Sequence, residues 1–200
     1  MSTLESRERS YHHGDLRAAL LAAASEVLEQ EGLSKLSLRE AARRAGVSHN
    51  APYRHFPDRE ALLAALAAQG FGMLAQAQRE GAATGGLRAM GEAYVRFALA
   101  HPQRFQLMFG GLVQVSRHPE LRDVATRTFE GLSGALAERA AGAKGASDAS
   151  VAAWALVHGL AHLLMDERIA SAAFAGRTRE QFVRDVLSTL RFAAGPAQSA

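Results

Sequence analysis

Apolar residues recur at spacings of three and four along most of this chain, which is the period of an amphipathic α-helix. The first series runs from Leu16 to Val27 and stops before Gly32, so it predicts a helix over about 16–31. Strands are not expected, because alternating apolar and polar runs bounded by turns are missing and β-branched residues are sparse. The pattern therefore predicts an all-α fold.

Capping residues, prolines and glycines divide the rest of the chain into further helices. Ser37 and Glu40 form a capping box that starts a short helix ending at Gly46. Ser48 is placed to cap a third short helix with Pro52 in its first turn, where a proline costs no hydrogen bond. Later helices are expected over about 59–80, 85–100, 102–110, 119–141, 148–167 and 178–193.

The second and third helices are joined by a Gly-Val turn and are expected to pack beneath the first. Two short helices held in this way under a longer one form a helix-turn-helix pattern. The remaining residues are far more than such a unit needs, and they predict a second, larger helical domain. The expected parts are a flexible arm (1–14), the helix-turn-helix domain (15–60), the helical domain (61–194) and a flexible tail (195–200).

Charge is concentrated on this same unit. The 200 residues are 48% hydrophobic and 22% charged, with a net charge of only +3. Between residues 33 and 59, however, there are six basic residues and only two acidic ones. A local basic surplus on a helix-turn-helix favours a nucleic-acid partner, and the alternative is a solvated helical face. The six are Lys35, Arg39, Arg43, Arg44, Arg54 and Arg59.

Composition removes several other classes of protein. The chain has no cysteine, which excludes disulfide frameworks, thiolate zinc sites and cysteine nucleophiles. No run of eighteen apolar residues and no signal-peptide core is present, so we expect a soluble, cytoplasmic protein without a membrane partner.

Residues 37–63 read SLREAARRAGVSHNAPYRHFPDREALL, and this segment resembles the DNA-binding signature of TetR-family transcriptional regulators. The Ala-Gly-Val-Ser turn, the Tyr-x-His-Phe motif and the following x-x-Lys-Glu-x-Leu motif are all present, with Arg59 replacing the usual lysine. Trp154, His158 and Gly159 resemble the Trp…His-Gly motif of one subgroup. The resemblance implies a dimeric regulator, most often a repressor, that a small apolar or amphipathic ligand releases from its DNA operator.

The resemblance also implies that Tyr53, His55 and Arg59 contact phosphates and that 49–52 face the major groove. Side-chain chemistry agrees, because Asn50 can pair with adenine and serine or histidine can donate to phosphate. In the alternative reading Asn50 only stabilises its own turn and Tyr53 belongs to the core. The expected DNA-binding residues are Ser37, Arg39, Ser48, His49, Asn50, Ala51, Pro52, Tyr53, His55 and Arg59.

TetR relatives hold a small-molecule pocket in the second domain and dimerise through the last two helices. By that resemblance, the expected pocket residues here are Phe97, Phe105, Met108, Phe109, Trp154, His158 and His162. The expected dimer residues are Leu156, Leu160, Leu163, Phe182, Val186 and Leu190. Core packing within one chain is the alternative for both sets.

Two other functions stay open from the sequence. His158, His162 and Asp166 share one helical stripe and could serve a metal-dependent helical enzyme, although a fourth ligand and the His-Glu-x-x-His pattern are missing. A helical interaction module without DNA binding is the other. No phosphate-binding loop, dinucleotide fingerprint or nucleophile motif is present, so we expect no enzyme and no cofactor.

Overall fold

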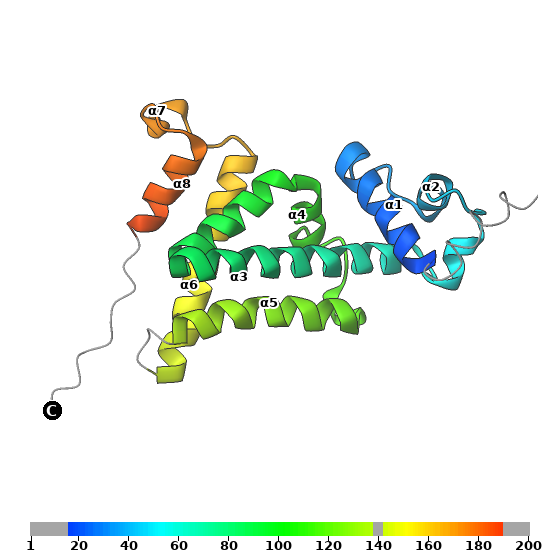
Figure 1. The fold of residues 1–200 in the computed structure, drawn as a ribbon, viewed down its shortest axis with the longest axis horizontal. Helices are drawn as coiled ribbons and strands as arrows, with labels where there is room; N and C mark the ends of the chain where they lie inside the picture. Colours follow the sequence, from blue (N-terminus) through cyan, green and yellow to red (C-terminus); the bar gives the residue numbers. More distant parts are fainter. Residues whose placement is uncertain (1–15, 138–141, 190–200) are drawn as a thin grey trace, which may run out of the picture.

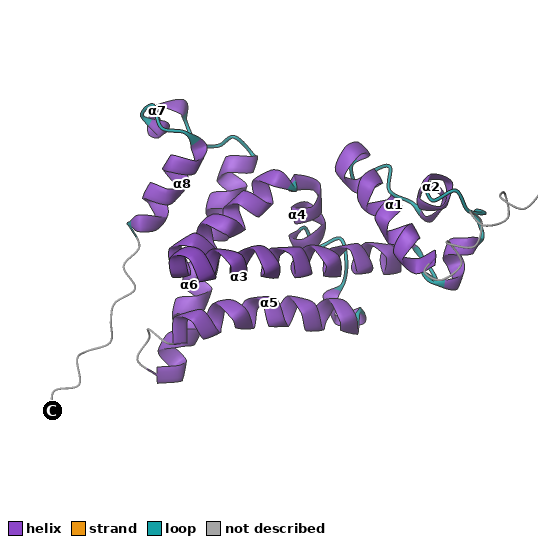
Figure 2. Cartoon of the chain, viewed as in Figure 1, coloured by secondary structure: helices purple, strands orange, loops and turns teal. Residues whose placement is uncertain are grey.

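A computed structural model of the chain describes residues 16–137 and 142–189, with the side chains of 142–147 left out. The arm expected over 1–14, the tail expected over 195–200 and Leu190 lie outside this range. The described residues are helical and contain no strand, as Figure 2 shows, so the all-α prediction is confirmed. The helices are α1 (Leu16–Glu31), α2 (Leu38–Arg44), α3 (Arg59–Ala100), α4 (Pro102–Phe109), α5 (Pro119–Ala137), α6 (Gly142–Met165), α7 (Ser171–Phe174) and α8 (Arg179–Ser188).

Helices α1 and α2 and the short turn that follows them lie together at one end of α3 (Figure 1). The prediction of an α-helix after Ser48 is wrong, because the structure has a single 3-10 turn there, η2 (Ala51–Arg54). Its first residue follows Asn50, and no side chain caps it. Pro52 and Pro57 explain the difference, since a proline disfavours the α conformation of the residue before it.

The long helix α3 combines two helices that the sequence predicts separately. It changes direction at Gly85 and Gly86, and Gly86 takes a φ of +65°, where glycine is favoured. The second segment then turns back along the first: a Cβ on Gly81 would lie 2.6 Å from the Ala89 carbonyl oxygen. Only a glycine therefore fits at position 81, and the two segments of α3 enclose space between them.

The core is built around α3. In Figure 1, α4 lies on one side of α3 and α5 on the other, while α6 crosses at the end far from α1 and α2. Leu66, Leu74 and Phe105 are fully or almost fully buried where these helices meet. Helix α8 packs on α3 as well, and a capping box between Thr178 and Gln181 begins it where the sequence predicts a helix from residue 178.

One apolar segment is less covered than its composition leads one to expect. Among the described helices, residues 148–165 of α6 have the length and hydropathy of a membrane span, yet only 33% of them are buried in the protomer. A core helix of a soluble protein has the same length and composition. The exposed remainder includes Val151 and Leu163, which are 52% and 47% exposed.

Candidate nucleic-acid interface and effector cavity

Most of the predicted base-reading and phosphate-binding residues around η2 are exposed. Residues 48–50, at the end of the turn after α2, are exposed, and so are residues 53–55 in and just after η2. Tyr53 is 50% exposed although its ring is large and largely apolar, so it is not a core aromatic. We call residues 48–50 and 53–55 the reading surface. It presents hydroxyl, amide, imidazole and guanidinium groups to solvent.

Pro52 does not share this exposure. It is buried, while Ala51 is half-buried, and Phe56 keeps only 2% of its surface exposed. The Pro52 carbonyl oxygen accepts from the backbone N–H groups of His55 and Phe56, both at 2.9 Å. The expected contact of Pro52 with a base is therefore corrected: Pro52 and Phe56 anchor η2 to the core and hold the polar residues between them outward.

Arg59 has a structural role that the sequence does not predict. Its Nε donates to the Leu36 carbonyl oxygen at 2.8 Å and its Nη2 to the Leu33 carbonyl oxygen at 2.9 Å. These two bonds satisfy backbone acceptors in the turn between α1 and α2. The guanidinium thus positions that turn, and because Arg59 is exposed, its contact with a phosphate stays a prediction.

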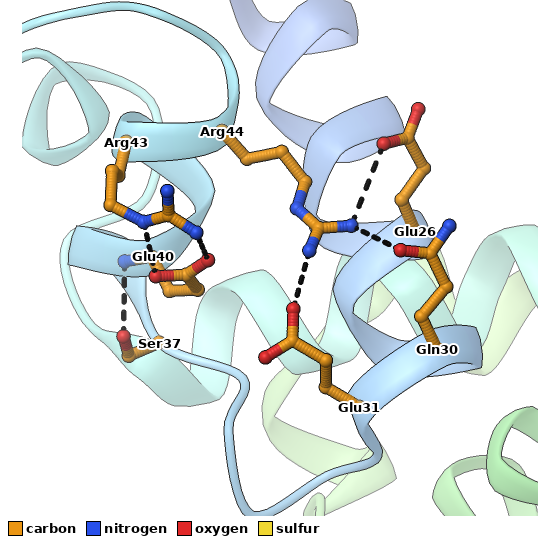
Figure 3. Close-up of polar contacts among 7 residues, drawn as sticks. All are labelled: Glu26, Gln30, Glu31, Ser37, Glu40, Arg43 and Arg44. Carbon is orange, nitrogen blue, oxygen red and sulfur yellow. Dashed lines mark hydrogen bonds and ion pairs between the residues drawn. The ribbon is translucent and has the colours of Figure 1, made fainter.

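Arg44 fixes α2 onto α1, as Figure 3 shows. Its guanidinium bonds the carboxylate of Glu31, donates to Gln30 Oε1 at 2.7 Å and lies 3.7 Å from a carboxylate oxygen of Glu26. Only 21% of the Arg44 side chain is exposed, so these pairs are partly shielded from water. The sequence predicts Arg44 on a solvated basic face and gives no sign that this side chain joins α2 to α1.

Arg43 is also occupied, by its own helix. It pairs with Glu40 through two hydrogen bonds of 2.8 and 2.5 Å (Figure 3), and the bond from this guanidinium lowers the pKa of the Glu40 carboxyl. Ser37 Oγ accepts from the Glu40 backbone N–H at 3.1 Å, which confirms Ser37 as the cap, whereas the Glu40 carboxylate pairs with Arg43 instead of closing the predicted capping box. Arg39 is exposed and makes no ion pair with the described residues, so it adds a free positive charge beside the reading surface.

The second candidate site is a cavity of about 430 Å³ between α3, α4, α5 and α6. Its walls are apolar and aromatic, which is usual for sites that take small organic molecules. Phe71 and Phe109 meet edge to face at 5.2 Å between ring centroids, and Phe129 and Trp154 at 5.9 Å. The lining residues are Phe71, Leu74, Gln78, Tyr94, Met108, Phe109, Gly111, Val113, Val115, Ala125, Thr128, Phe129, Leu132 and Trp154.

The predicted cavity residues divide into two groups. Met108, Phe109 and Trp154 line the cavity. Phe105 is completely buried in the core, and Phe97 packs against His101 with ring centroids 5.1 Å apart, so both belong to the packed interior instead. The prediction failed for these two because aromatic residues at helical spacing serve a core and a cavity wall equally well.

His158 and His162 stand behind the cavity wall rather than in it. Tyr94 Oη lies 2.9 Å from His158 Nδ1 and accepts a hydrogen bond from Trp154 Nε1 at 3.3 Å. Burial lowers the pKa of the His158 imidazole, the neighbouring His162 lowers it further, and burial raises the pKa of the Tyr94 phenol. Tyr94, His158 and Trp154 thus form an uncharged, hydrogen-bonded group that supports the cavity wall.

The metal-site hypothesis finds no support in this geometry. The described residues contain no group of three or more His, Cys, Asp or Glu side chains placed to hold an ion. His158 and His162 are neighbours, with ring centroids 4.7 Å apart, but Asp166 lies on the exposed end after α6.

The predicted dimer residues are also split by burial. Leu160 and Phe182 are buried within the protomer, with 7% and 9% of their surface exposed, so they serve intrachain packing. Leu156 and Val186 are half-buried, and Leu163 is exposed. Sequence reasoning missed Gln78 and Tyr94 in the cavity. A lone glutamine or tyrosine in a helix carries no local signal of its surroundings.

Exposed helix-turn-helix residues at one end and an apolar cavity at the other define a DNA-binding regulator with an effector domain. Comparison with known families agrees. Residues 20–66 match the bacterial regulatory proteins of the tetR family, and residues 87–190 match the tetracyclin repressor-like C-terminal domain. The chain belongs to the tetR family, and it is a ligand-responsive, DNA-binding transcriptional regulator.

Solved structures show the same fold. A protein of unknown function from Rhodococcus sp. RHA1 is 34% identical, with a TM-score of 0.75 over 90% of this chain and 96% of that one. The multidrug binding protein EbrR complexed with ethidium is 22% identical, with a TM-score of 0.63 over 89% and 99% of the two chains. The TetR family regulator PfmR from Thermus thermophilus is 18% identical, with a TM-score of 0.56 over 86% and 91%. No curated protein matches the chain.

Proposed function

We propose that the chain is a homodimeric repressor that reads its operator through the reading surface and leaves it when a small apolar or amphipathic molecule fills the cavity. The observation that carries the proposal is the exposure of residues 48–50 and 53–55, beside a protomer core that holds Pro52 and Phe56. Polar side chains of this kind without internal partners are available for a ligand. A duplex supplies the phosphates and base edges that they recognise.

The individual roles follow from side-chain chemistry. Asn50 can pair with the N6 and N7 edge of adenine, and His49 can donate to a guanine acceptor. Tyr53, Arg54 and His55 are phosphate donors, which position the protein without reading sequence. Ser48 joins the phosphate contacts, and Arg39 adds attraction to the backbone that weakens as salt is raised.

A second copy of the chain fits the exposed apolar part of α6. Val151 and Leu163 lie exposed on a helix segment whose mean hydropathy is that of a buried one, and the small residue Gly159 has no atom within 4 Å of the place a Cβ would occupy. Such a face allows two helices to approach closely. The dimer would then present two reading surfaces to successive major grooves, roughly 34 Å apart. Its place is the cytoplasm, with the DNA.

The Trp…His-Gly motif has a structural role under this proposal. Trp154 and His158 both bond the hydroxyl of Tyr94, and Trp154 also lines the cavity. We therefore assign the chain to the subgroup that carries this motif, with the motif acting as the support of the effector site.

Helix α4 connects the cavity with the reading end. It contributes Met108 and Phe109 to the cavity wall and Arg104 to the packing against α1. Arg104 is 2% exposed, its Nε donates to Glu29 Oε1 at 2.9 Å, and its Nη2 donates to Ser25 Oγ. A ligand that displaces α4 must move this pair, and it weakens DNA binding by favouring a non-binding arrangement of the two reading surfaces.

Gel-shift titration on the DNA upstream of the gene, repeated at several salt concentrations, tests the proposal. We expect a steep salt dependence with retained sequence preference. Tyr53→Phe should weaken affinity for all sequences alike, whereas Asn50→Ala should mainly relax preference at one base pair. Gln76→Ala, exposed on α3 away from the reading surface, is the control. Undiminished binding by both reading-surface variants would contradict the proposal.

A further inference from the structure

We infer that the cavity takes a small, uncharged aromatic molecule carrying an N–H or O–H donor, and that Gln78 accepts the hydrogen bond from that donor. This inference deepens the proposed function and rests on it, because it names the chemical class of the effector. It starts from an unsatisfied polar atom in an otherwise apolar wall.

Gln78 is buried, with 5% of its surface exposed, and its Oε1 has no hydrogen-bond partner. A buried polar group without a partner is unfavourable, so such groups are rare in the interior of a protein. Within the described part of the chain the only other such side-chain atom is Arg104 Nη1, and Arg104 does not line the cavity. Gln78 therefore brings one unfilled acceptor to the wall; this oxygen is shut off from solvent, and rotation of the terminal amide turns it toward a ligand.

The other polar groups of the wall are already occupied. The Tyr94 hydroxyl is shared between His158 and Trp154. Thr128 Oγ1 donates to the carbonyl oxygens of Val124 at 2.8 Å and Phe71 at 3.3 Å. A ligand entering the cavity thus finds its free hydrogen-bonding group at the Gln78 amide, because the Tyr94 and Thr128 hydroxyl protons are already used.

The position of Gln78 is central as well as polar. It lines the 430 Å³ cavity and also a smaller adjoining space of about 130 Å³, together with Tyr94, Leu132 and Trp154. A molecule that occupies the larger space lies against this partition. Its donor can therefore reach Gln78 while its ring stays among the aromatic side chains.

The lining supplies no counter-charge for an ionic ligand. None of the lining residues of the larger space is acidic, basic or histidine. Moving an ion from water into such a wall is strongly unfavourable without a counter-charge. Phe71, Phe109, Phe129 and Trp154 instead offer ring edges and faces, which favour a flat aromatic partner.

Three probes of similar size test the inference: 4-tert-butylphenol, its methyl ether 4-tert-butylanisole, and the cation phenyltrimethylammonium. Trp154 is the single tryptophan and lines the cavity, so its fluorescence, excited at a wavelength that the probes do not absorb, reports binding to the full chain without DNA. We expect the phenol to bind roughly tenfold more tightly than the ether, and the cation to bind most weakly.

Gln78→Met removes the acceptor and keeps a flexible side chain of similar length. The ratio of phenol to ether affinity should then fall to about one, because the ether loses nothing. Gln76→Met makes the same chemical change on the exposed side of α3 and should keep the wild-type ratio. Gln78→Met should also raise the melting temperature, since an unpaired buried acceptor has been removed.

Equal affinity of phenol and ether for the wild-type chain, an unchanged ratio in Gln78→Met, tighter binding of the cation, or no binding by any probe would each overturn the inference. The proposed function fails separately. If the ether released operator DNA as readily as the phenol, the repressor mechanism would stand and the role of Gln78 would be wrong. If the phenol bound through Gln78 without releasing DNA, the ligand class would stand and the release mechanism would be wrong.

Discussion

The reading end and the cavity end of this chain place their functional side chains in opposite ways. The reading surface comes from residues 48–50 and 53–55, which are close neighbours in sequence and are exposed. The cavity wall comes from α3, α4, α5 and α6, so its residues are far apart in sequence and largely buried. A side chain at the reading end can therefore be changed with little effect on folding, whereas one at the cavity end contributes to function and stability together.

The largest expected effect tests whether the two ends differ in their contribution to stability. Phe71→Ala, in the cavity wall, should lower the free energy of unfolding by about 3–5 kcal/mol, because a buried phenyl ring is lost and the void is enlarged. Tyr53→Ala, at a ring that is 50% exposed, should change stability by less than about 0.5 kcal/mol. Urea unfolding followed by circular dichroism measures both. Comparable losses in the two variants would show that the reading end is part of the core.

The same contrast explains what could be predicted from sequence. Helices α1 and α2 and the Ser37 cap depend on local patterns, and periodicity and capping residues predict them; the family resemblance adds the outward placement of Tyr53 and His55. The α-helix predicted after Ser48 is a 3-10 turn in the structure, because Pro52 and Pro57 each disfavour the α conformation of the residue before them.

The cavity could be predicted only in part, because it depends on the path of the chain. The turn at Gly85 and Gly86 brings Tyr94 opposite Gln78, and neither residue carries a local sign of that meeting. Phe105 and Phe109 are one helical turn apart on α4, yet Phe109 lines the cavity and Phe105 is buried in the core. Spacing along one helix does not distinguish such positions.

The second largest effect is expected at the ion pair of Arg104 and Glu29, which connects α4 at the cavity end with α1 at the reading end. Glu29→Ala should lower the free energy of unfolding by about 2 kcal/mol, because Arg104 is left buried without its carboxylate. The double variant Glu29→Ala/Arg104→Met should lose less than the single one, since no buried cation remains. Both should reduce the release of DNA by 4-tert-butylphenol in gel shifts. A double variant less stable than Glu29→Ala would argue against an electrostatic joint.

Neighbouring arginines at the reading end sharpen the comparison on a smaller scale. Arg44→Met should destabilise the chain by about 1 kcal/mol, because the bonds from α2 to Glu31 and Gln30 are lost. It should also weaken operator binding, since α2 loses its fixed position. Arg43→Met breaks only an exposed pair within α2 and should leave the unfolding curve unchanged. Thermal melts and gel shifts on the two variants would contradict this account if they showed the opposite order.

The smallest effect concerns the pH dependence of stability. Burial lowers the pKa of His158 in the folded chain, so below the ordinary value of 6.5 the unfolded chain binds more protons than the folded one. The free energy of unfolding should therefore fall as the pH drops from 7 to 5. His158→Gln, which keeps an acceptor for the Tyr94 hydroxyl, should flatten that decline, whereas His49→Gln on the reading surface should keep the wild-type slope. Denaturant melts across this range would detect the difference, and parallel curves for the wild type and His158→Gln would show that the cavity wall does not resist protonation.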